Sequence, residues 1–209
     1  MSKNLIAIYG GSFNPPTVAH ENIARDILKL DEINKLIYLP VGDSYKKKTL
    51  ISAQQRYNML KIILEKLKSD GLDVDISRLE IESEKRLYTL QSLRILKEKY
   101  KSDLAFIMGT DNIKQFSSWY NPKELLEEFY FVVIEREEDN VINLIKEDSL
   151  LKDYEDRFII LTETSYKDIS STYIRDNLYI DNKIGDYIDI NVLKYIKENK
   201  LYKGGELSN

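Results

Sequence analysis

The segment from Tyr9 to His20 has the composition of a loop that binds phosphate groups. It follows a short apolar run, and Gly10 and Gly11 free the backbone to turn sharply and approach a ligand closely. Thr17 is placed to cap the helix that follows, and His20 falls in its first turn. Because backbone N–H groups at a helix N-terminus attract anions, a histidine there becomes a donor to bound phosphate. An isolated histidine would more simply be a solvated helix residue.

A second set of phosphate donors is indicated near the other end of the chain. Ser170-Ser171-Thr172 is typical of a helix start. Arg175 falls one turn later, on the face that Ser171 and Thr172 share. Such a cluster suits a triphosphate, because charge-assisted bonds to phosphate are strong and arginine binds two oxygens at once. By itself the pattern also fits a helix cap followed by a surface arginine.

Three other positions each allow two interpretations. The run Lys46-Lys47-Lys48 follows a Pro-Val-Gly-Asp turn and fits either a solvated surface or a site for an anionic substrate. Trp119, the only tryptophan, fits either a core position or a ring that stacks on a ligand. Asp111 fits either a helix cap or an acceptor for a ribose hydroxyl.

Several other chemistries are excluded by pattern. The loop lacks the Gly-Lys-Ser/Thr ending of a Walker P-loop and the glycine spacing of a dinucleotide fingerprint. With no cysteine and one histidine, the sequence has neither thiolate zinc ligands nor a histidine-rich metal site. Gly10-x-Ser12-x-Asn14 differs from a nucleophile elbow at its last residue. Among 35 acidic residues, no pair stands out for acid and base catalysis.

The elements that must position these residues alternate between strands and helices, which predicts a parallel sheet flanked by helices. Strands are expected at residues 5–8, 36–39, 104–108, 129–134 and 158–161, with residues 73–81 extended. Helical stripes are expected over residues 23–28, 89–100 and 189–200, over a short peripheral helix near 141–145, and at Ala53, Tyr57, Leu60, Leu64 and Leu67. Residues 204–209 are expected to fray.

Ligands of open parallel sheets bind beyond the carboxyl ends of the strands. Four segments that follow predicted strands stand out: residues 10–20, 41–48, 109–119 and 170–175. We expect these four segments to converge on one site.

Composition limits the cellular setting. The chain has 209 residues, a net charge of −4 and no cysteine, and no run of about 18 apolar residues that could span a membrane. These features predict a cytoplasmic protein without a membrane partner, and the acidic balance disfavours nucleic acid. The 15 tyrosines fit either a homo-oligomer interface or a simple bias in composition.

Residues 11–20 and 169–175, read as GSFNPPTVAH and ISSTYIR, resemble the paired signature of the HxGH-type nucleotidyltransferases. Within that group the chain is most similar to the nicotinate/nicotinamide mononucleotide adenylyltransferases. Shorter matches follow in the family's order at residues 40–48, 88–90 and 109–111, and at Trp119. The resemblance spans residues 5–202, and its motifs fall after successive predicted strands.

Two residues depart from the bacterial pattern. Thr17 stands where that pattern has its first histidine, and Ala19 stands where it has glycine. The phosphate site therefore resembles the threonine-containing form of the eukaryotic nicotinamide-nucleotide enzymes, as does the run from Tyr45 to Lys48. The short chain and the motif at residues 109–119 are more similar to the bacterial form.

The resemblance implies a Rossmann-like, doubly wound, mostly parallel sheet with helices on both faces. It implies one nucleotidyltransferase domain over residues 1–203, with a small C-terminal helical portion. The implied reaction joins ATP to nicotinate or nicotinamide mononucleotide, releasing pyrophosphate, in NAD biosynthesis. Because the attacking phosphate is already an anion, neither a protein base nor a covalent intermediate is expected.

The resemblance also implies roles for single residues. The catalytic group comprises His20, Arg175 and Lys47. The ATP site comprises Gly11, Ser12, Phe13, Thr17, His20, Gly109, Asp111, Ile169, Ser170, Ser171 and Arg175. The mononucleotide site comprises Ser12, Phe13, Lys47, Lys48, Tyr88, Thr89 and Trp119. Mg²⁺ is expected to arrive on ATP, without protein ligands of its own.

Three other functions remain open from the sequence. A related transferase acting on phosphopantetheine or a cytidylyl substrate shares the first and last motifs, although Trp119 and the lysine run fit a pyridine ring better. A nucleotide sensor would bind ATP without releasing pyrophosphate. An oligomeric scaffold would leave the loops without a ligand, which the convergence of four donor segments disfavours.

Overall fold

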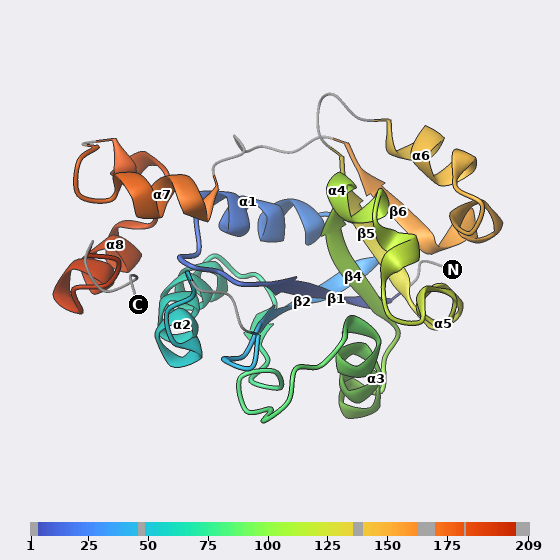
Figure 1. Ribbon diagram of the computed structural model, residues 1–209, viewed down its shortest axis with the longest axis horizontal. Helices are drawn as coiled ribbons and strands as arrows, with labels where there is room; N and C mark the ends of the chain where they lie inside the picture. The colour runs from blue at the N-terminus through green and yellow to red at the C-terminus, as the bar shows by residue number, and fades with distance from the viewer. Residues whose placement is uncertain (1–3, 46–48, 136–139, 163–169, 182, 204–209) are drawn as a thin grey trace.

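The computed structural model describes residues 4–45, 49–135, 140–162, 170–181 and 183–203. Its strands are β1 (Leu5–Gly11), β2 (Ile33–Pro40), β3 (Val74–Ile76), β4 (Leu104–Gly109), β5 (Tyr130–Ile134) and β6 (Phe158–Leu161). Within these residues the strands form one parallel sheet in the order β3-β2-β1-β4-β5-β6 (Figure 1). The order reverses between β1 and β4, as in a doubly wound fold.

Eight α-helices and three short 3₁₀ segments connect and follow the strands in the described residues. The α-helices are α1 (Val18–Ile27), α2 (Ala53–Ser69), α3 (Thr89–Tyr100), α4 (Thr110–Ile113), α5 (Pro122–Glu128), α6 (Val141–Glu147), α7 (Ser171–Asn177) and α8 (Ile190–Glu198). The 3₁₀ segments are η1 (Phe116–Ser118), η2 (Leu151–Arg157) and η3 (Ile184–Asp186). Side chains of Ser52, Asn140, Ser170 and Asp189 accept hydrogen bonds from the first turns of α2, α6, α7 and α8.

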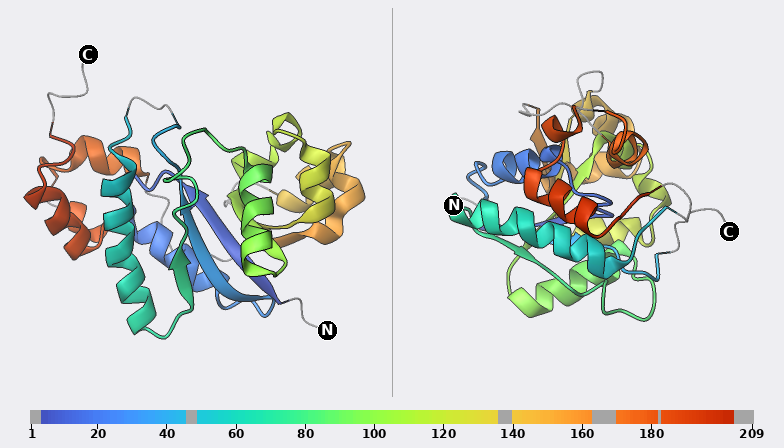
Figure 2. Two further views of the ribbon diagram at one scale, coloured as in Figure 1. Left: turned by 90° about the horizontal axis from the view of Figure 1, so that it is seen from below. Right: turned by 90° about the vertical axis from the view of Figure 1, so that its left-hand side faces the viewer.

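The central strands β1, β4 and β5 are buried on both faces, which explains their continuous apolar runs. In β1, Leu5 and Ala7 belong to a core that includes side chains of α1, α2, α7 and α8. Ile6 and Ile8 belong to a second core with side chains of α3, α5 and α6. The sheet therefore lies between two helical layers, with α2 and α3 on opposite sides of it (Figure 2).

The structure confirms the Rossmann-like fold, the helices on both faces and the helical C-terminal portion. The extended segment expected at residues 73–81 is wrong beyond Ile76, because only Val74–Ile76 pairs with β2. After it, the Ser77 hydroxyl accepts a hydrogen bond from the Leu79 amide at 3.2 Å, which turns the backbone away from the sheet.

The buried face of α2 also differs from the expected stripe. Tyr57 is only partly buried and packs under the Arg78 guanidinium, 4.6 Å from the ring centroid. Ala53, Leu60, Leu64 and Leu67 are buried as expected, and the buried face also includes Arg56, Met59 and Ile63. Among the described residues, no helix is long and apolar enough to cross a bilayer. The expected frayed tail, residues 204–209, lies outside the described residues.

Candidate active site

Strands β1 and β4 end side by side at the point where the strand order reverses. Ligands of such sheets bind in the crevice at this point. β1 ends at Gly11 and β4 at Gly109, and α1 and α4 begin shortly after them. A Cβ atom on Gly10 would lie 2.9 Å from the Phe106 ring, so a side chain there would clash with that ring.

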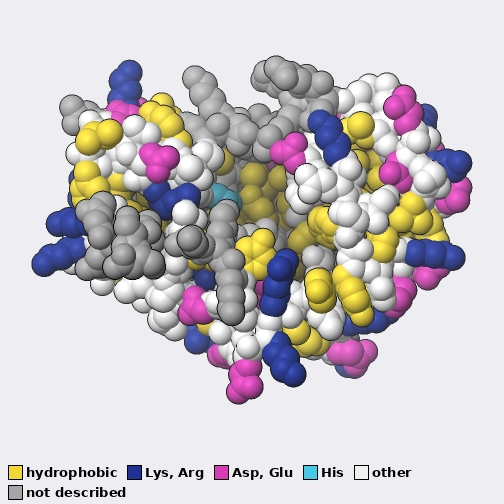
Figure 3. Space-filling view, viewed as in Figure 1, with side chains coloured by type: hydrophobic (Ala, Val, Ile, Leu, Met, Phe, Trp, Pro, Cys, Tyr) yellow, Lys and Arg dark blue, Asp and Glu magenta, His cyan; other side chains and the backbone are white. Residues whose placement is uncertain are grey.

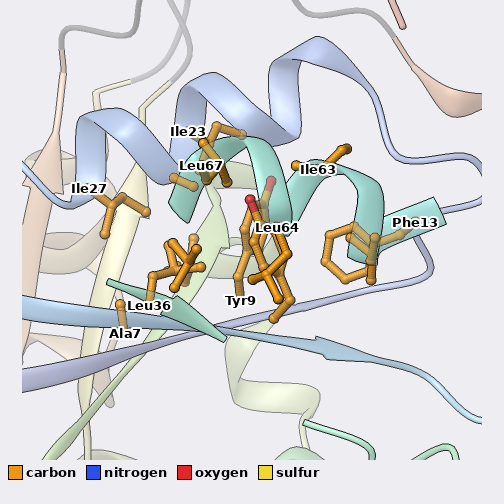
Figure 4. Packing of buried hydrophobic residues seen from close by; sticks show 14 of the residues in the cluster. Ala7, Tyr9, Phe13, Ile23, Ile27, Leu36, Ile63, Leu64 and Leu67 are labelled. Carbon is orange, nitrogen blue, oxygen red and sulfur yellow. The ribbon is translucent and has the colours of Figure 1, made fainter. Parts of the chain in front are cut away.

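The loop at residues 12–17 is fixed by an aromatic anchor. Phe13 has a φ of +46°, in the left-handed region, and its side chain is only 1% exposed. Its ring makes edge contacts with Tyr9 and Tyr38 at centroid distances of 5.5 Å. Figure 4 shows Phe13 in the apolar layer beside α2. Burial of the ring offsets the cost of the unfavourable backbone angle.

His20 lies in the first turn of α1, with its ring 5.1 Å from that of Phe13. Its Nδ1 atom accepts a hydrogen bond from the Thr17 amide at 3.0 Å, and the Thr17 hydroxyl lies 2.8 Å away. Because a backbone amide can only donate, Nδ1 carries no proton, and the proton of the neutral ring is on Nε2. The backbone amide of Thr17 thus gives the imidazole a defined tautomer with its outer nitrogen as a donor, and the Thr17 hydroxyl can donate to the same Nδ1 atom.

Burial lowers the pKa of His20 from 6.5 to about 4. Between these values the folded protein binds fewer protons at this residue than the unfolded chain. The contribution of His20 to stability is therefore complete above pH 6.5 and is lost as the pH falls toward 4. We expect the melting temperature of the wild type to fall more steeply between pH 7 and 4 than that of a His20→Gln variant. If the melting temperatures of the two proteins fall equally across this pH range, the lowered pKa of His20 is contradicted.

Helix α7 meets the loop through two of its predicted phosphate donors. The Ser171 hydroxyl donates to the Pro15 carbonyl at 2.8 Å. Arg175 donates from Nη1 to the Asn14 carbonyl at 2.7 Å and from Nη2 to the Thr172 hydroxyl at 2.9 Å. The structure thus brings the loop and the start of α7 together, as the sequence predicted. A guanidinium has five N–H donors, so Arg175 retains donors for a ligand while it holds the loop.

The buried side chain of Asn14 connects the loop to two further segments. Its Nδ2 donates to the Thr49 carbonyl at 2.7 Å, and its Oδ1 accepts from the Ile51 amide at 3.3 Å. The same oxygen accepts from the Tyr202 hydroxyl at 2.9 Å. The loop is therefore held by groups from residues 49–51 and from beyond α8.

Arg56 contacts the site from helix α2. Its side chain is fully buried and donates to three carbonyls: from Nη1 to Ser12 at 2.9 Å, from Nη2 to Val41 at 2.6 Å, and from Nε to Ile51 at 3.1 Å. The Asp43 carboxylate lies 3.8 Å from Nη2. One side chain of α2 therefore links the segments that follow β1 and β2.

A cavity of about 380 Å³ opens beside the loop. It is in the size range of small-ligand sites. Gly10 and Gly11 of β1 contribute to its wall. The remaining lining residues come from the ends of β2 and β4 and from the segments before α3 and α5: Leu39, Val41, Tyr45, Glu80, Arg86, Leu87, Tyr88, Thr89, Phe106, Ser118 and Trp119.

Aromatic rings form much of this cavity wall. Trp119 is partly buried, stacks on Phe116 at 5.1 Å and meets the edge of Phe106 at 6.0 Å. Tyr88 stacks on Tyr120 at 4.6 Å. Trp119 is thus neither a core residue nor fully exposed, because one side packs on the protein while the residue also lines the cavity. This arrangement suits a flat ring as ligand.

One cation and one carboxyl group lie on the described cavity wall. The Arg86 guanidinium is held over the Tyr45 ring at 4.7 Å. Glu80 accepts a hydrogen bond from the Ser92 hydroxyl at 2.7 Å, and burial raises its pKa. Figure 3 shows the histidine of the chain on a face where apolar side chains lie close to lysine and arginine side chains.

The other predicted residues are placed as follows. Gly109 precedes α4, whose first turn contains the exposed Asp111, and Ser170 caps α7. Tyr88 and Thr89 lie at the start of α3 and line the cavity. The predicted residues Lys47, Lys48 and Ile169 lie outside the described residues. In the described part of the chain, no group of three or more His, Asp or Glu side chains could hold a metal ion.

Comparison with known proteins identifies the family. The cytidylyltransferase-like family model matches residues 8–177. A protein of Acholeplasma laidlawii named probable nicotinate-nucleotide adenylyltransferase is 35% identical over 95% of this chain and 98% of its own length. The chain belongs to the nicotinate-nucleotide adenylyltransferase family. A protein of the same name from Fusobacterium nucleatum is 36% identical over 92% of this chain and 97% of its own length.

Solved structures of the nicotinate-nucleotide adenylyltransferase family share this architecture. The Plasmodium falciparum nicotinic acid mononucleotide adenylyltransferase complexed with APC has a TM-score of 0.76 and 28% identity, over 96% of this chain and 97% of that chain. The same enzyme complexed with NaAD has a TM-score of 0.75 and 27% identity, with the same coverage. The family and its fold, predicted from the paired motifs, are confirmed.

Sequence reasoning missed three contacts of this adenylyltransferase site. Arg56 left a signal, because a charged residue on the apolar face of a predicted helix is unusual. Arg86 and Tyr202 left none: one is a charged residue in a charged segment, and the other lies far along the chain from its partner Asn14.

Proposed function

We propose that this protein transfers the adenylyl group of ATP to nicotinate mononucleotide in NAD biosynthesis. A phosphate oxygen of the mononucleotide forms a bond to the α-phosphorus of ATP. The bond from that phosphorus to the bridging oxygen breaks, and pyrophosphate leaves with the electron pair. The related proteins and the structures with APC and NaAD support this reaction, because their names specify the same substrate class.

The observation that carries the proposal is the shared boundary between two subsites. Gly11 ends β1 directly before the loop that leads to His20, and it also forms part of the wall of the aromatic cavity. A phosphate group held by the loop is therefore adjacent to a flat ring held in the cavity. A mononucleotide has these two parts, joined by a ribose.

On the ATP side, the proposed work is positioning and charge neutralisation. Nε2 of His20 donates to a phosphate oxygen, and Arg175 binds the far end of the triphosphate with Ser171 and Ser170 beside it. Backbone groups of residues 11–13 and Thr17 complete this cradle. We assign Gly109 and Asp111 to the adenosine ribose and Ile169 to the ATP site, because their motifs match those of the family. Preorganised donors of this kind stabilise charge in the transition state without reorganising during the reaction.

On the mononucleotide side, we propose that Trp119 stacks on the pyridine ring and that Tyr88 and Thr89 contact it from the start of α3. Lys47 and Lys48 would face the incoming phosphate, on the strength of their motif. The Arg86 cation near the cavity wall favours the carboxylate of nicotinate over the neutral amide of nicotinamide.

We propose that Mg²⁺ enters with ATP. Such an ion takes phosphate oxygens and water as ligands, so it does not require a protein cage. When bound it neutralises charge on the triphosphate, while His20 and Arg175 orient the same group. A cytoplasmic location and a homo-oligomeric state are further proposals, which fractionation and light scattering would test.

Pyrophosphate release tests the proposed reaction. Purified protein is assayed with ATP and Mg²⁺, in parallel with nicotinate mononucleotide, nicotinamide mononucleotide or neither. We expect release that depends on a pyridine nucleotide, with kcat/KM at least about tenfold higher for nicotinate, the discrimination that one charged contact can provide. ATP binding without release would favour a sensor. Release only with 4′-phosphopantetheine, or with CTP and an alcohol phosphate, would favour a related transferase.

Trp119→Ala tests the ring site. Loss of a stacking ring costs about 1–3 kcal/mol, so we expect the KM for nicotinate mononucleotide to rise by about tenfold, with less change for Trp119→Phe. The KM for ATP should change by less than about twofold. Because the wild type has a single tryptophan, quenching of its fluorescence by the mononucleotide measures binding directly. Quenching by ATP alone, with no response to the mononucleotide, would place the ring elsewhere.

A further inference from the structure

We propose that Arg56 is a positioning residue that aims the backbone N–H groups of Phe13 and Gly42 at the reacting phosphates. The proposal rests on the adenylyl transfer proposed above and extends it to a side chain that contacts no substrate. Its basis is the set of three carbonyls that this buried guanidinium holds.

The geometry of the peptide group links Arg56 to these two amides. In a trans, planar peptide the C=O of one residue and the N–H of the next point in opposite directions. Arg56 draws the carbonyls of Ser12 and Val41 toward α2, at 2.9 and 2.6 Å. The amides in the same two peptide groups, those of Phe13 and Gly42, are therefore directed away from α2.

Both amides lie beside residues that line the cavity, because Gly42 follows Val41 and Phe13 lies two residues after Gly11. Within the part of the chain that the structure describes, neither the Phe13 nor the Gly42 amide has a hydrogen-bond acceptor. Buried or half-buried amides are normally paired, so two unpaired ones beside a cavity indicate an acceptor that arrives with a substrate. Phosphate oxygens are such acceptors.

The fixed backbone angles explain why one rigid side chain is used. Phe13 is in the left-handed region, and Gly42 has no room for a side chain, because a Cβ atom there would lie 1.9 Å from the Glu80 carbonyl oxygen. The planar guanidinium spans both peptide groups with donors at fixed spacing. An ammonium group on a flexible stem cannot hold both orientations at once.

The position of the charge also bears on the role. The Arg56 side chain is fully buried, and Asp43, its partner at 3.8 Å, is largely exposed. The Asp43 carboxylate in turn accepts from the Ala53 amide at the start of α2, at 2.7 Å. Burying a guanidinium is costly unless its N–H donors are paired. Here those donors are paired with backbone carbonyls of the site itself.

Arg56→Lys tests the proposal by its effect on turnover. Removing one preorganised backbone donor lowers kcat by about 10²–10³, so disorienting two of them should lower kcat by at least about tenfold. The KM values for ATP and nicotinate mononucleotide should change by less than about threefold. Leu67→Ala is the matched control, because Leu67 is also buried on α2 but lies toward its other end. It should lower the melting temperature and leave kcat at the assay temperature unchanged. Equal kcat in the two variants would overturn the proposal.

A second measurement needs no variant and no acceptor. In ¹⁵N-labelled wild-type protein, we expect addition of Mg²⁺-ATP to shift the amide proton resonance of Phe13, and addition of inorganic pyrophosphate to shift at least one of Phe13 and Gly42. These shifts should shrink in Arg56→Lys and persist in Leu67→Ala. Unshifted resonances at both amides under saturating ATP would overturn the positioning role. Shifted resonances in a protein that fails to release pyrophosphate would instead reject only the proposed reaction.

Discussion

Replacing His20 with alanine is expected to lower kcat by about 10² or more, which is the scale for losing one donor at a charged transition state. The KM values for ATP and the mononucleotide should change by less than about threefold, because the donor acts mainly on charge that develops during the reaction. The neutral ring with its proton on Nε2 is the form that the Thr17 contacts select. Steady-state assays at pH 7.5 measure this change.

Two further variants separate this role from damage to α1. His20→Gln retains a side-chain N–H donor, so it should recover part of the lost turnover. Arg25→Ala removes a surface residue of the same helix, paired with Asp70, and should leave kcat unchanged. If His20→Ala retains kcat within about threefold of the wild type, His20 is not a transition-state donor.

Replacing Arg175 with alanine is expected to weaken the use of ATP. A hydrogen bond to a charged group contributes about 1.5–3 kcal/mol, so the KM for ATP should rise by about 10- to 100-fold. The KM for the mononucleotide should change much less, because Arg175 lies on α7, away from the described cavity wall. Initial rates with one substrate varied at saturating concentrations of the other measure the two effects separately.

Arg175→Lys distinguishes charge from geometry at this position. Lysine keeps the charge but cannot hold the Asn14 carbonyl and a phosphate with the same fixed fork, so we expect an intermediate KM for ATP. Arg157→Ala is the matched control, since it removes an arginine that is held by a contact within the fold, over the Tyr130 ring, but lies in η2 rather than on the loop. An Arg175→Ala variant with unchanged ATP saturation would leave the arginine with only its structural contact to the loop.

Most of the fold follows from local sequence pattern. The apolar runs at β1, β4 and β5 and the helical stripes of α3 and α8 lie where the sequence placed them, because burial on both sheet faces demands unbroken apolar runs. The segment after β3 was mispredicted for a reason of context. Its residues have strand composition, but a side-chain turn at Ser77 competes with pairing at the sheet edge.

The site was predictable where its residues lie in contiguous motifs. The loop to His20 and the start of α7 are short patterns with a local physical meaning, and parallel strands bring their ends together. Arg56 and Tyr202 could not be assigned a role, because each acts through a tertiary contact to a backbone carbonyl or an amide oxygen. Such contacts leave no motif in the neighbouring residues, and the one local sign was the charge of Arg56 on an otherwise apolar helix face.

The contacts of Asn14 have a consequence for the order of synthesis. Its loop is made near the start of translation, whereas Arg175 and Tyr202, which hold that loop, are made near the end. A nascent chain that has not yet produced α7 lacks these holds even when β1 to β4 are complete. The loop therefore gains these contacts late, because β1 to β4 are synthesised before the segments that supply the Arg175 and Tyr202 hydrogen bonds.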